Sequence, residues 1–192
     1  MNHYIQNTKY YLTTYKKQIL TTGIVLLVLA AITTGIIFLV KNSGTKIVYQ
    51  PANACDLLTP DEARDLLGNK SIHSGVETPV LQGNTATSKC GYTDGNPDMN
   101  SAIVAAIVVR SGVNDKGVTQ NQKEFDAGRP TKNVEDVQRV GDKAYFNRDN
   151  GQLNVLKGHE WILFSYGVGA SPSTNTLDDA LKLADKVLQK SV

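Results

Sequence analysis

The most constraining feature of the chain is an uninterrupted apolar stretch at residues 19–40, ILTTGIVLLVLAAITTGIIFLV. Its 22 residues include no charge, no amide side chain and no proline. As a helix rising about 1.5 Å per residue it is about 33 Å long, which matches a bilayer core of about 30 Å. Buried core helices are seldom apolar all round, and a signal peptide has a shorter apolar region of about 7–15 residues. The sequence therefore predicts a retained single-pass membrane helix.

The flanking charges and the cysteines predict the orientation of this helix. Lys9, Lys16 and Lys17 precede the stretch and Lys41 and Lys46 follow it, so the positive-inside rule favours a cytoplasmic N-terminus by a small margin. Both cysteines lie on the C-terminal side, and a cysteine pair is typical of domains that fold outside the cytoplasm. We expect a protein of the cell membrane whose C-terminal domain is extracytoplasmic.

The anchor divides the chain into four parts. Residues 1–18 are expected to form a cytoplasmic tail, residues 19–40 the transmembrane helix, residues 41–53 a tether, and residues 54–192 the extracytoplasmic domain. At about 3.5 Å per residue, the tether holds the domain within about 45 Å of the membrane. The net charge of +2 is too small to indicate nucleic-acid binding.

Capping signals predict two helices within the domain. Thr59 is an expected N-cap, with Pro60 in the first helical position and Glu62 in the third, and Gly68 can end the helix in the left-handed conformation. The last helix is expected to begin after Thr176, where apolar residues recur at spacings of three, four and seven. A further helix is plausible over TQNQKEFDAG, residues 119–128.

The remaining segments predict strands and turns. Residues 69–87 are broken by glycine, proline and polar residues, so we expect a loop with at most one short strand. Strands are expected over SKCGYTD, SAIVAAIVVRS, KAYFNR, QLNVLK and EWILFSYGV, with Asn150–Gly151 in a hairpin turn. Tight turns between successive strands indicate an antiparallel sheet. The expected class is α+β, with a sheet of about five strands and helices packed on one face.

The two cysteines, Cys55 and Cys90, are either reactive thiols or a structural bridge. A thiol nucleophile needs a neighbouring base or a helix N-terminus, and Thr59 already caps the helix that follows Cys55. A bridge closing a loop of about 36 residues stabilises a domain by roughly 3–4 kcal/mol. We therefore predict a Cys55–Cys90 disulfide.

The order of these motifs resembles that of a family of extracytoplasmic domains common in actinobacterial lipoproteins, which open with a Cys-x-Leu-Leu-Thr-x-x-Glu-Ala helix. The matching positions are Cys55, Leu57, Leu58, Thr59, Glu62, Ala63, Leu67, Gly68, Cys90, Tyr92, Gly141, Asp142 and Ala144. The resemblance covers essentially the whole domain and implies a fold and a compartment, because the family has no agreed biochemical activity. Its members are typically held by a lipid, whereas this chain has an apolar helix.

Side chains for catalysis or metal binding are sparse. Zinc sites take three or four convergent ligands, and the domain has only His73 and His159 beside cysteines expected to be oxidised. Ser101 and Ser165 are available as nucleophiles, but no GxSxG elbow occurs. We expect no catalytic site, no metal site and no cofactor.

One polar segment faintly resembles a calcium loop. Asp94, Asn96, Asp98 and Asn100 alternate as ligands would, but Met99 stands where the sharp-turn glycine belongs, and no glutamate follows at the last ligand position. A polar connection between strands is the better interpretation, and weak metal binding stays open.

Aromatic residues gather on the predicted hairpin strands. Alternation places Trp161 on one face of its strand and Phe164 and Tyr166 on the other. Tyr145, Trp161, Phe164 and Tyr166 are the candidates for a ligand face, should no helix cover them. The plainer interpretation is that aromatic strand residues belong to the core.

Three functions are compatible with these features. The first is an interaction module of the cell envelope that binds an envelope protein or a cell-wall component through an open sheet face or residues 69–87. The second is an envelope hydrolase or transferase that uses His73 or His159. The third is a structural subunit of an envelope assembly, in which the membrane helix itself makes the contact.

Overall fold

The computed structural model describes residues 45–68, 72–98, 100–168 and 174–191. Thr45–Val192 forms one compact unit. The predicted tail and membrane helix, residues 1–40, lie outside the described residues. Among the helices that are described, none is both long and apolar enough to cross a bilayer.

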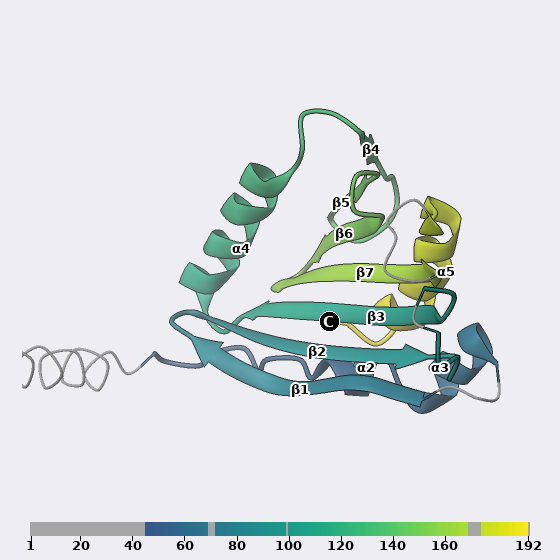
Figure 1. The fold of residues 1–192 in the computed structure, drawn as a ribbon. Coiled ribbons are helices and arrows are strands. Elements are labelled where there is room, and N and C mark those ends of the chain that lie inside the picture. Colours follow the sequence, from purple (N-terminus) through teal and green to yellow (C-terminus); the bar gives the residue numbers. More distant parts are fainter. Residues whose placement is uncertain (1–44, 69–71, 99, 169–173, 192) are drawn as a thin grey trace, which may run out of the picture. The chain divides into compact units, whose positions relative to one another are not determined.

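The compact unit is built on one antiparallel sheet with the strand order β1-β2-β3-β7-β6-β5-β4 (Figure 1). The strands are β1 Ile72–Gln82, β2 Thr85–Thr93, β3 Ile103–Gly112, β4 Val134–Asp136, β5 Lys143–Asn147, β6 Gln152–Lys157 and β7 Glu160–Val168. The helices are α2 Ala54–Leu57, α3 Pro60–Leu67, α4 Asp115–Gly128 and α5 Leu177–Leu188. The predicted α+β class is confirmed, but the sheet has seven strands rather than about five.

Local capping signals set the ends of α3 and α5 as expected. The backbone N–H of Thr59 donates to Glu62 Oε2 over 2.8 Å, and Gly68 ends α3 with a φ of 83°. The hydroxyl of Thr176 accepts from the N–H of Asp179 at 3.1 Å and begins α5. These bonds involve residues at most a few positions apart, so the sequence alone could indicate them.

The largest departure from expectation is the segment 69–87, which was expected to be mainly loop. From Ile72 it forms the long edge strand β1, which pairs with β2 across a turn at Gly83. The register of this pair is irregular beside Gly75 and around Pro79. An edge strand tolerates such residues, because its outer side needs no regular ladder. Glycine and proline therefore misled the interpretation of this segment.

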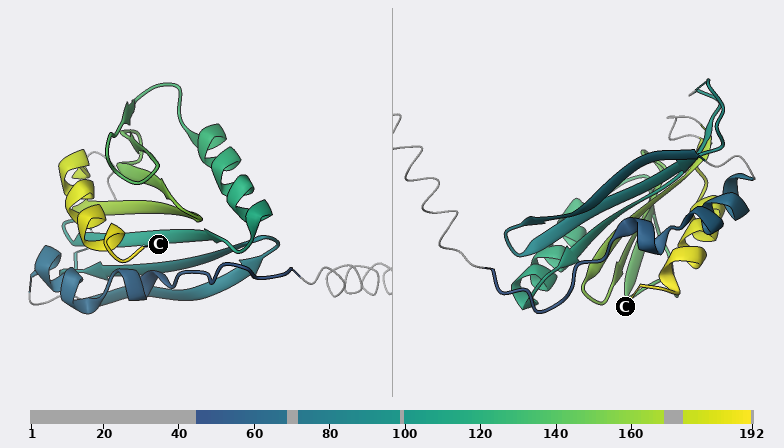
Figure 2. Two further views of the ribbon diagram at one scale, coloured as in Figure 1. Left: turned by 180° about the vertical axis from the view of Figure 1, so that it is seen from behind. Right: turned by 90° about the horizontal axis from the view of Figure 1, so that it is seen from below.

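The main core lies between the sheet and three helices, α2, α3 and α5, which cover the same face (Figure 2). Phe164 of β7, Ile107 of β3 and Leu153 of β6 point into it and meet Leu183 of α5 and Leu58, which follows α2. All five side chains are nearly or fully buried. This core joins both ends of the compact unit to the centre of the sheet.

The fourth helix, α4, packs against the opposite face of the sheet. Its Phe125 forms a second buried cluster with Tyr145 and Leu156, and Trp161 packs against that cluster. Tyr145, Leu156 and Trp161 alternate along their strands with residues of the main core, so they point away from it. The expectation that the helices pack on one face therefore holds for α2, α3 and α5 but not for α4.

Candidate functional site

A cavity of about 520 Å³ lies where the beginning and the end of the compact unit meet. It is lined by Val48, Tyr49, Gln50, Pro51, Ala52, Asn53, Asp56, Leu57, His159, Glu160, Lys190 and Ser191. These residues come from the segment before α2, from α2 itself, from the β6–β7 turn and the start of β7, and from the segment after α5. A volume of this size is typical of small-molecule sites.

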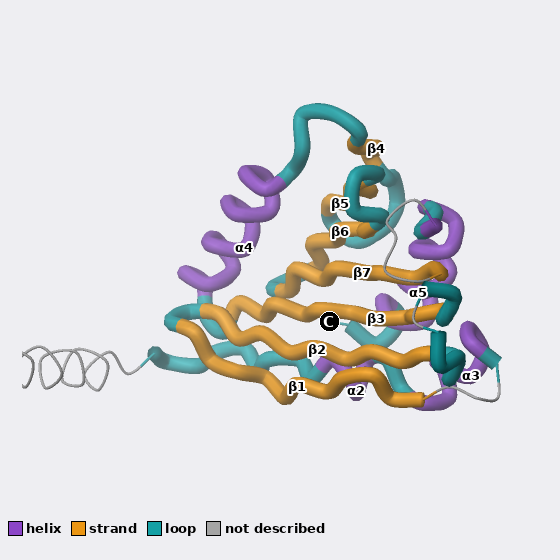
Figure 3. Tube along the Cα trace, in the orientation of Figure 1, coloured by secondary structure: helices purple, strands orange, loops and turns teal. Residues whose placement is uncertain are grey.

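The wall formed by residues 48–53 is held in place by hydrogen bonds to the sheet region, along which it runs as irregular chain (Figure 3). The N–H of Val48 donates to the carbonyl of Val113 over 2.7 Å. The buried hydroxyl of Ser88 donates to the carbonyl of Ala52 at 2.9 Å and accepts from the N–H of Ala54 at 3.0 Å. The compact unit thus begins at Thr45, and the later part of the segment expected to be a tether is docked on the domain.

Glu160 is the unusual residue of this cavity. It begins β7 and is only 2% exposed, and its Oε2 has no hydrogen-bond partner in the described part of the chain. Burial raises the pKa of Glu160, while the Ser191 hydroxyl and the nearby His159 and Lys157 act in the opposite direction. A buried carboxyl with one oxygen left without a partner, at the wall of a cavity, is suited to receive a ligand's hydrogen-bond donor.

The lysines around the cavity are committed to other groups. The ammonium of Lys190 donates to the carbonyl of Leu57 at 3.2 Å and forms an ion pair with Glu62. Lys157 donates to the carbonyls of Leu188 and Ser191 at 2.6 and 2.5 Å. Both lysines thus fasten the end of the chain, and the Oε2 atom of Glu160 receives no hydrogen bond from either of them.

His159 contributes one edge of the cavity. Its imidazole stacks on the ring of Tyr49, with 5.1 Å between the ring centroids and 19° between the planes. The Tyr49 hydroxyl donates to Asp115 Oδ1 over 2.7 Å, and this bond raises the pKa of Tyr49. The carbonyl of His159 accepts from Gly112 N–H at 2.7 Å. The histidine is therefore positioned from both its ring and its backbone.

The four aromatic residues proposed as a ligand face do not form one surface. Phe164 is fully buried in the main core, and the Tyr166 hydroxyl on the same face donates to the carbonyl of Leu66 at 2.8 Å. Tyr145 and Trp161 lie on the opposite face, where Phe125 of α4 packs on them. Phe164 therefore belongs to the core, as the plainer interpretation holds. Tyr145 and Trp161, on the other face, pack against α4.

That opposite face is only partly occupied by the α4 cluster. The indole N–H of Trp161 donates to Asn154 Oδ1 at 3.2 Å, and the Arg110 guanidinium lies 5.9 Å from the centre of the ring. Farther along β3 and β7, the side chains of Val108 and Leu163 are half-buried. The sheet therefore presents a short accessible apolar strip as well as the covered cluster.

The other polar candidates are engaged locally. In the segment that resembles a calcium loop, Asp94 Oδ1 accepts from Asn96 N–H at 3.1 Å and Asp98 Oδ1 accepts from Asn100 N–H at 3.1 Å. The bond from Asn100, with that from the Ser101 hydroxyl, lowers the pKa of Asp98. Their side chains stabilise the turns of a polar connection. The Ser165 hydroxyl accepts from Gln152 Nε2 at 3.2 Å, and no described contact joins it to a histidine.

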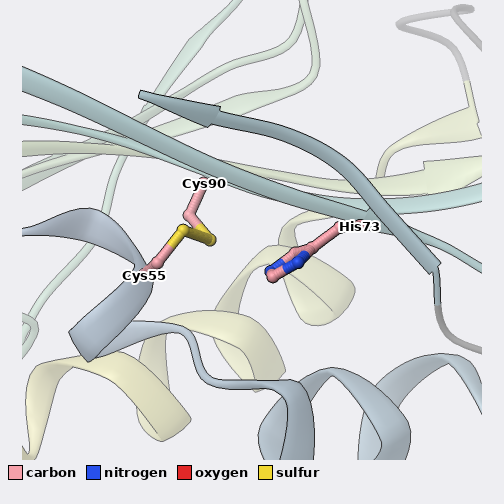
Figure 4. A group of neighbouring side chains, drawn as sticks. All are labelled: Cys55, His73 and Cys90. Atoms are coloured by element: carbon pink, nitrogen blue, oxygen red, sulfur yellow. A yellow bond between two sulfur atoms is a disulfide. The ribbon is translucent and has the colours of Figure 1, made fainter. Parts of the chain in front are cut away.

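The predicted disulfide between Cys55 of α2 and Cys90 of β2 is present, with 5.1 Å between the Cα atoms. The imidazole of His73, on β1, lies beside it (Figure 4). The two sulfurs and a ring nitrogen of His73 all fall within 4.8 Å of one another. Sequence reasoning missed this cluster, because His73 was placed in a loop and its neighbours depend on the β1–β2 register.

Comparisons of the chain with protein-family models, with curated proteins and with solved structures find no match.

Proposed function

We propose that the protein is a membrane-anchored, extracytoplasmic binding module of the cell envelope, and that its ligand enters the cavity over Glu160. The apolar stretch 19–40 supports the anchor, and the Cys55–Cys90 disulfide supports an oxidising compartment. The observation that carries the binding function is the buried Glu160 carboxyl, whose Oε2 is unpaired among the described residues.

The chemistry of the cavity defines the class of ligand. Ionised Glu160 is costly to bury without a counter-charge, and a cationic donor would supply both the charge and the missing hydrogen bond. Val48, Pro51 and Leu57 add apolar wall around it. The ligand is therefore a group with a short apolar stem and a terminal ammonium, presented by an envelope protein or a cell-wall component.

Three small probes of equal stem length test this assignment. Binding of n-butylammonium, n-butanol and n-butyrate to the full chain in lipid nanodiscs is measured by saturation-transfer NMR. We expect the ammonium to bind best and the carboxylate worst, and Glu160→Gln to abolish the preference. Glu77→Gln removes an exposed carboxyl that pairs with Lys89 and serves as the matched control. Equal binding of butyrate and butylammonium would overturn the proposal.

Chemical labelling of intact cells tests the compartment separately. After treatment with an impermeant phosphine reductant, an impermeant maleimide should label Cys55, which is half-buried and lies C-terminal to the anchor. A Tyr4→Cys substitution in the N-terminal tail provides the control, because it should react only once the membrane is permeabilised. Labelling of Tyr4→Cys, but not of Cys55, in intact cells would reverse the orientation.

Histidine-dependent hydrolysis or group transfer is the second candidate function. It is supported by His159, which lines the same cavity one residue before the buried carboxyl. His159→Ala separates the two candidates. A binding site centred on Glu160 should keep its affinity for butylammonium within about twofold, since the probe's hydrogen bond goes to the carboxylate, whereas an enzyme would lose the general base it depends on.

A further inference from the structure

We propose that reduction of the Cys55–Cys90 disulfide creates, with His73, a binding site for a thiophilic d10 cation such as Zn²⁺. The site is separate from the Glu160 cavity and does not depend on the function proposed for it. Its three ligands come from α2, β1 and β2, which the fold brings together (Figure 4).

The geometry is close to that of a three-ligand metal site. With metal–sulfur bonds of about 2.3 Å and metal–nitrogen bonds of about 2.0–2.1 Å, tetrahedral ligands lie roughly 3.3–3.8 Å apart. The two sulfurs and the ring nitrogen already lie within 4.8 Å of one another, and the cysteine Cα atoms are 5.1 Å apart. Once the S–S bond is broken, the sulfurs need to separate by roughly 1.7 Å, and the imidazole needs to approach them by about 1 Å.

A stacking contact orients the imidazole of His73 without using its nitrogen atoms. Its ring stacks on Tyr92, with 4.2 Å between centroids and 29° between planes. Neither ring nitrogen forms a hydrogen bond with a described residue, so one can bind a metal. The register irregularity between His73 and Gly75 gives this part of the edge strand room to adjust.

The three ligands differ in exposure, and the difference leaves an entry path for a cation. Cys90 is 1% exposed, Cys55 is half-buried and His73 is exposed. A cation can therefore approach from the histidine side and reach the sulfurs, and a water molecule can complete the coordination. Two thiolates and an imidazole favour Zn²⁺ or another soft d10 ion over Mg²⁺ or Ca²⁺, which prefer oxygen ligands.

Reduction and metal binding are separate steps. A phosphine reductant attacks the disulfide and takes the oxygen of a water molecule to become a phosphine oxide, while the two hydrogens of that water end as the two thiol protons. Zn²⁺ then binds both sulfurs and His73, and the two thiol protons are released to solvent. A two-electron oxidant that restores the S–S bond expels the cation, so metal binding is controlled by redox state.

The test uses the untagged full chain in detergent, with Co²⁺ as a spectroscopic probe and Zn²⁺ as its competitor. After phosphine reduction, we expect a thiolate-to-cobalt charge-transfer band and the ligand-field bands of tetrahedral cobalt, both removed by Zn²⁺. The oxidised protein should show neither. Loss of an outer-shell partner weakens metal binding by about 10–100-fold, and His73→Ala, which removes a direct ligand, should weaken it at least as much.

His159→Ala is the matched control and should leave the cobalt spectrum and affinity unchanged, because His159 lies at the other cavity. Unchanged affinity in His73→Ala, or the same bands in the oxidised protein, would overturn the proposal. Should reduction unfold the domain, Zn²⁺ is expected to restore its far-ultraviolet circular dichroism in the wild type but not in His73→Ala. Failure of Zn²⁺ to bind or to restore folding would equally overturn it.

Discussion

The ring of Tyr49 lies stacked on the imidazole of His159, two residues separated by most of the domain sequence. Through this contact, the segment that follows the predicted anchor packs on the turn between β6 and β7. Because Glu160 follows directly, the first residues of the compact unit form one wall of the cavity that contains the buried carboxyl.

Glu160→Gln should change the pH dependence of stability. Burial raises the pKa of Glu160 in the folded state, so the folded protein binds the proton more tightly than the unfolded chain. Glu160 therefore leaves the free energy of unfolding unchanged below its unfolded pKa of about 4.3. As pH rises from there through the folded pKa, Glu160 lowers the free energy of unfolding. Urea unfolding at several pH values should show that Glu160→Gln gains stability relative to the wild type as pH rises through this range, whereas Glu77→Gln should not.

Replacing both cysteines by serine should lower the free energy of unfolding by about 3–4 kcal/mol, because the bridge restricts a long loop of the unfolded chain. The bridge spans a sequence separation of 35 and joins α2 to the sheet. Urea unfolding in the presence of a metal chelator measures the change. Wild type treated with a reductant should give the same loss, and a difference below about 1 kcal/mol would contradict the structural role of the bridge.

Ser88→Ala should release the docked segment before α2. The Ser88 hydroxyl is fully buried and bonds both the carbonyl of Ala52 and the N–H of Ala54. Its loss leaves two backbone groups without a partner, at an expected cost of about 1–3 kcal/mol. Trypsin cleavage after the exposed Lys46 should accelerate. Ser101→Ala, on an exposed loop, should change neither cleavage rate nor stability appreciably.

Phe125→Ala should detach α4 from the sheet. Phe125 is 2% exposed, and its ring centroid lies 6.0 Å from that of Trp161, the single tryptophan of the chain. We expect a loss of about 3 kcal/mol, at the lower end for such substitutions because the cluster is small, and a red shift of tryptophan emission. Phe125→Leu keeps most of the buried apolar volume and should cost less than Phe125→Ala. Unchanged emission in Phe125→Ala would show that α4 does not cover this face.

The sequence predicted the parts of the domain that depend on near neighbours. Caps at Thr59 and Thr176, the stops at Gly68 and Gly128, and the strands β5, β6 and β7 are confirmed. The disulfide pairing was also accessible, because two cysteines in one domain allow one bridge. These features depend on interactions between residues close in the chain, or on a choice with few alternatives.

The sequence did not indicate which distant segments would meet. β3 pairs with β7 rather than with the strands that follow it, and this pairing brings the His159 carbonyl to the Gly112 N–H. It thereby places Glu160 beside the segment docked on Val113. Glycine and proline in β1 indicated a loop, because they usually interrupt strands. An edge strand tolerates them. That error also hid the approach of His73 to the disulfide.

By itself, then, the sequence determined an apolar stretch of bilayer length, an α+β domain, its helix ends, its later hairpins and its bridge. Only the tertiary structure decided the strand order, the second face covered by α4, and the two places where distant polar residues gather, at Glu160 and at His73. The physical reason is that caps and turns involve a few adjacent residues, whereas strand pairing and burial depend on whole faces packing at once.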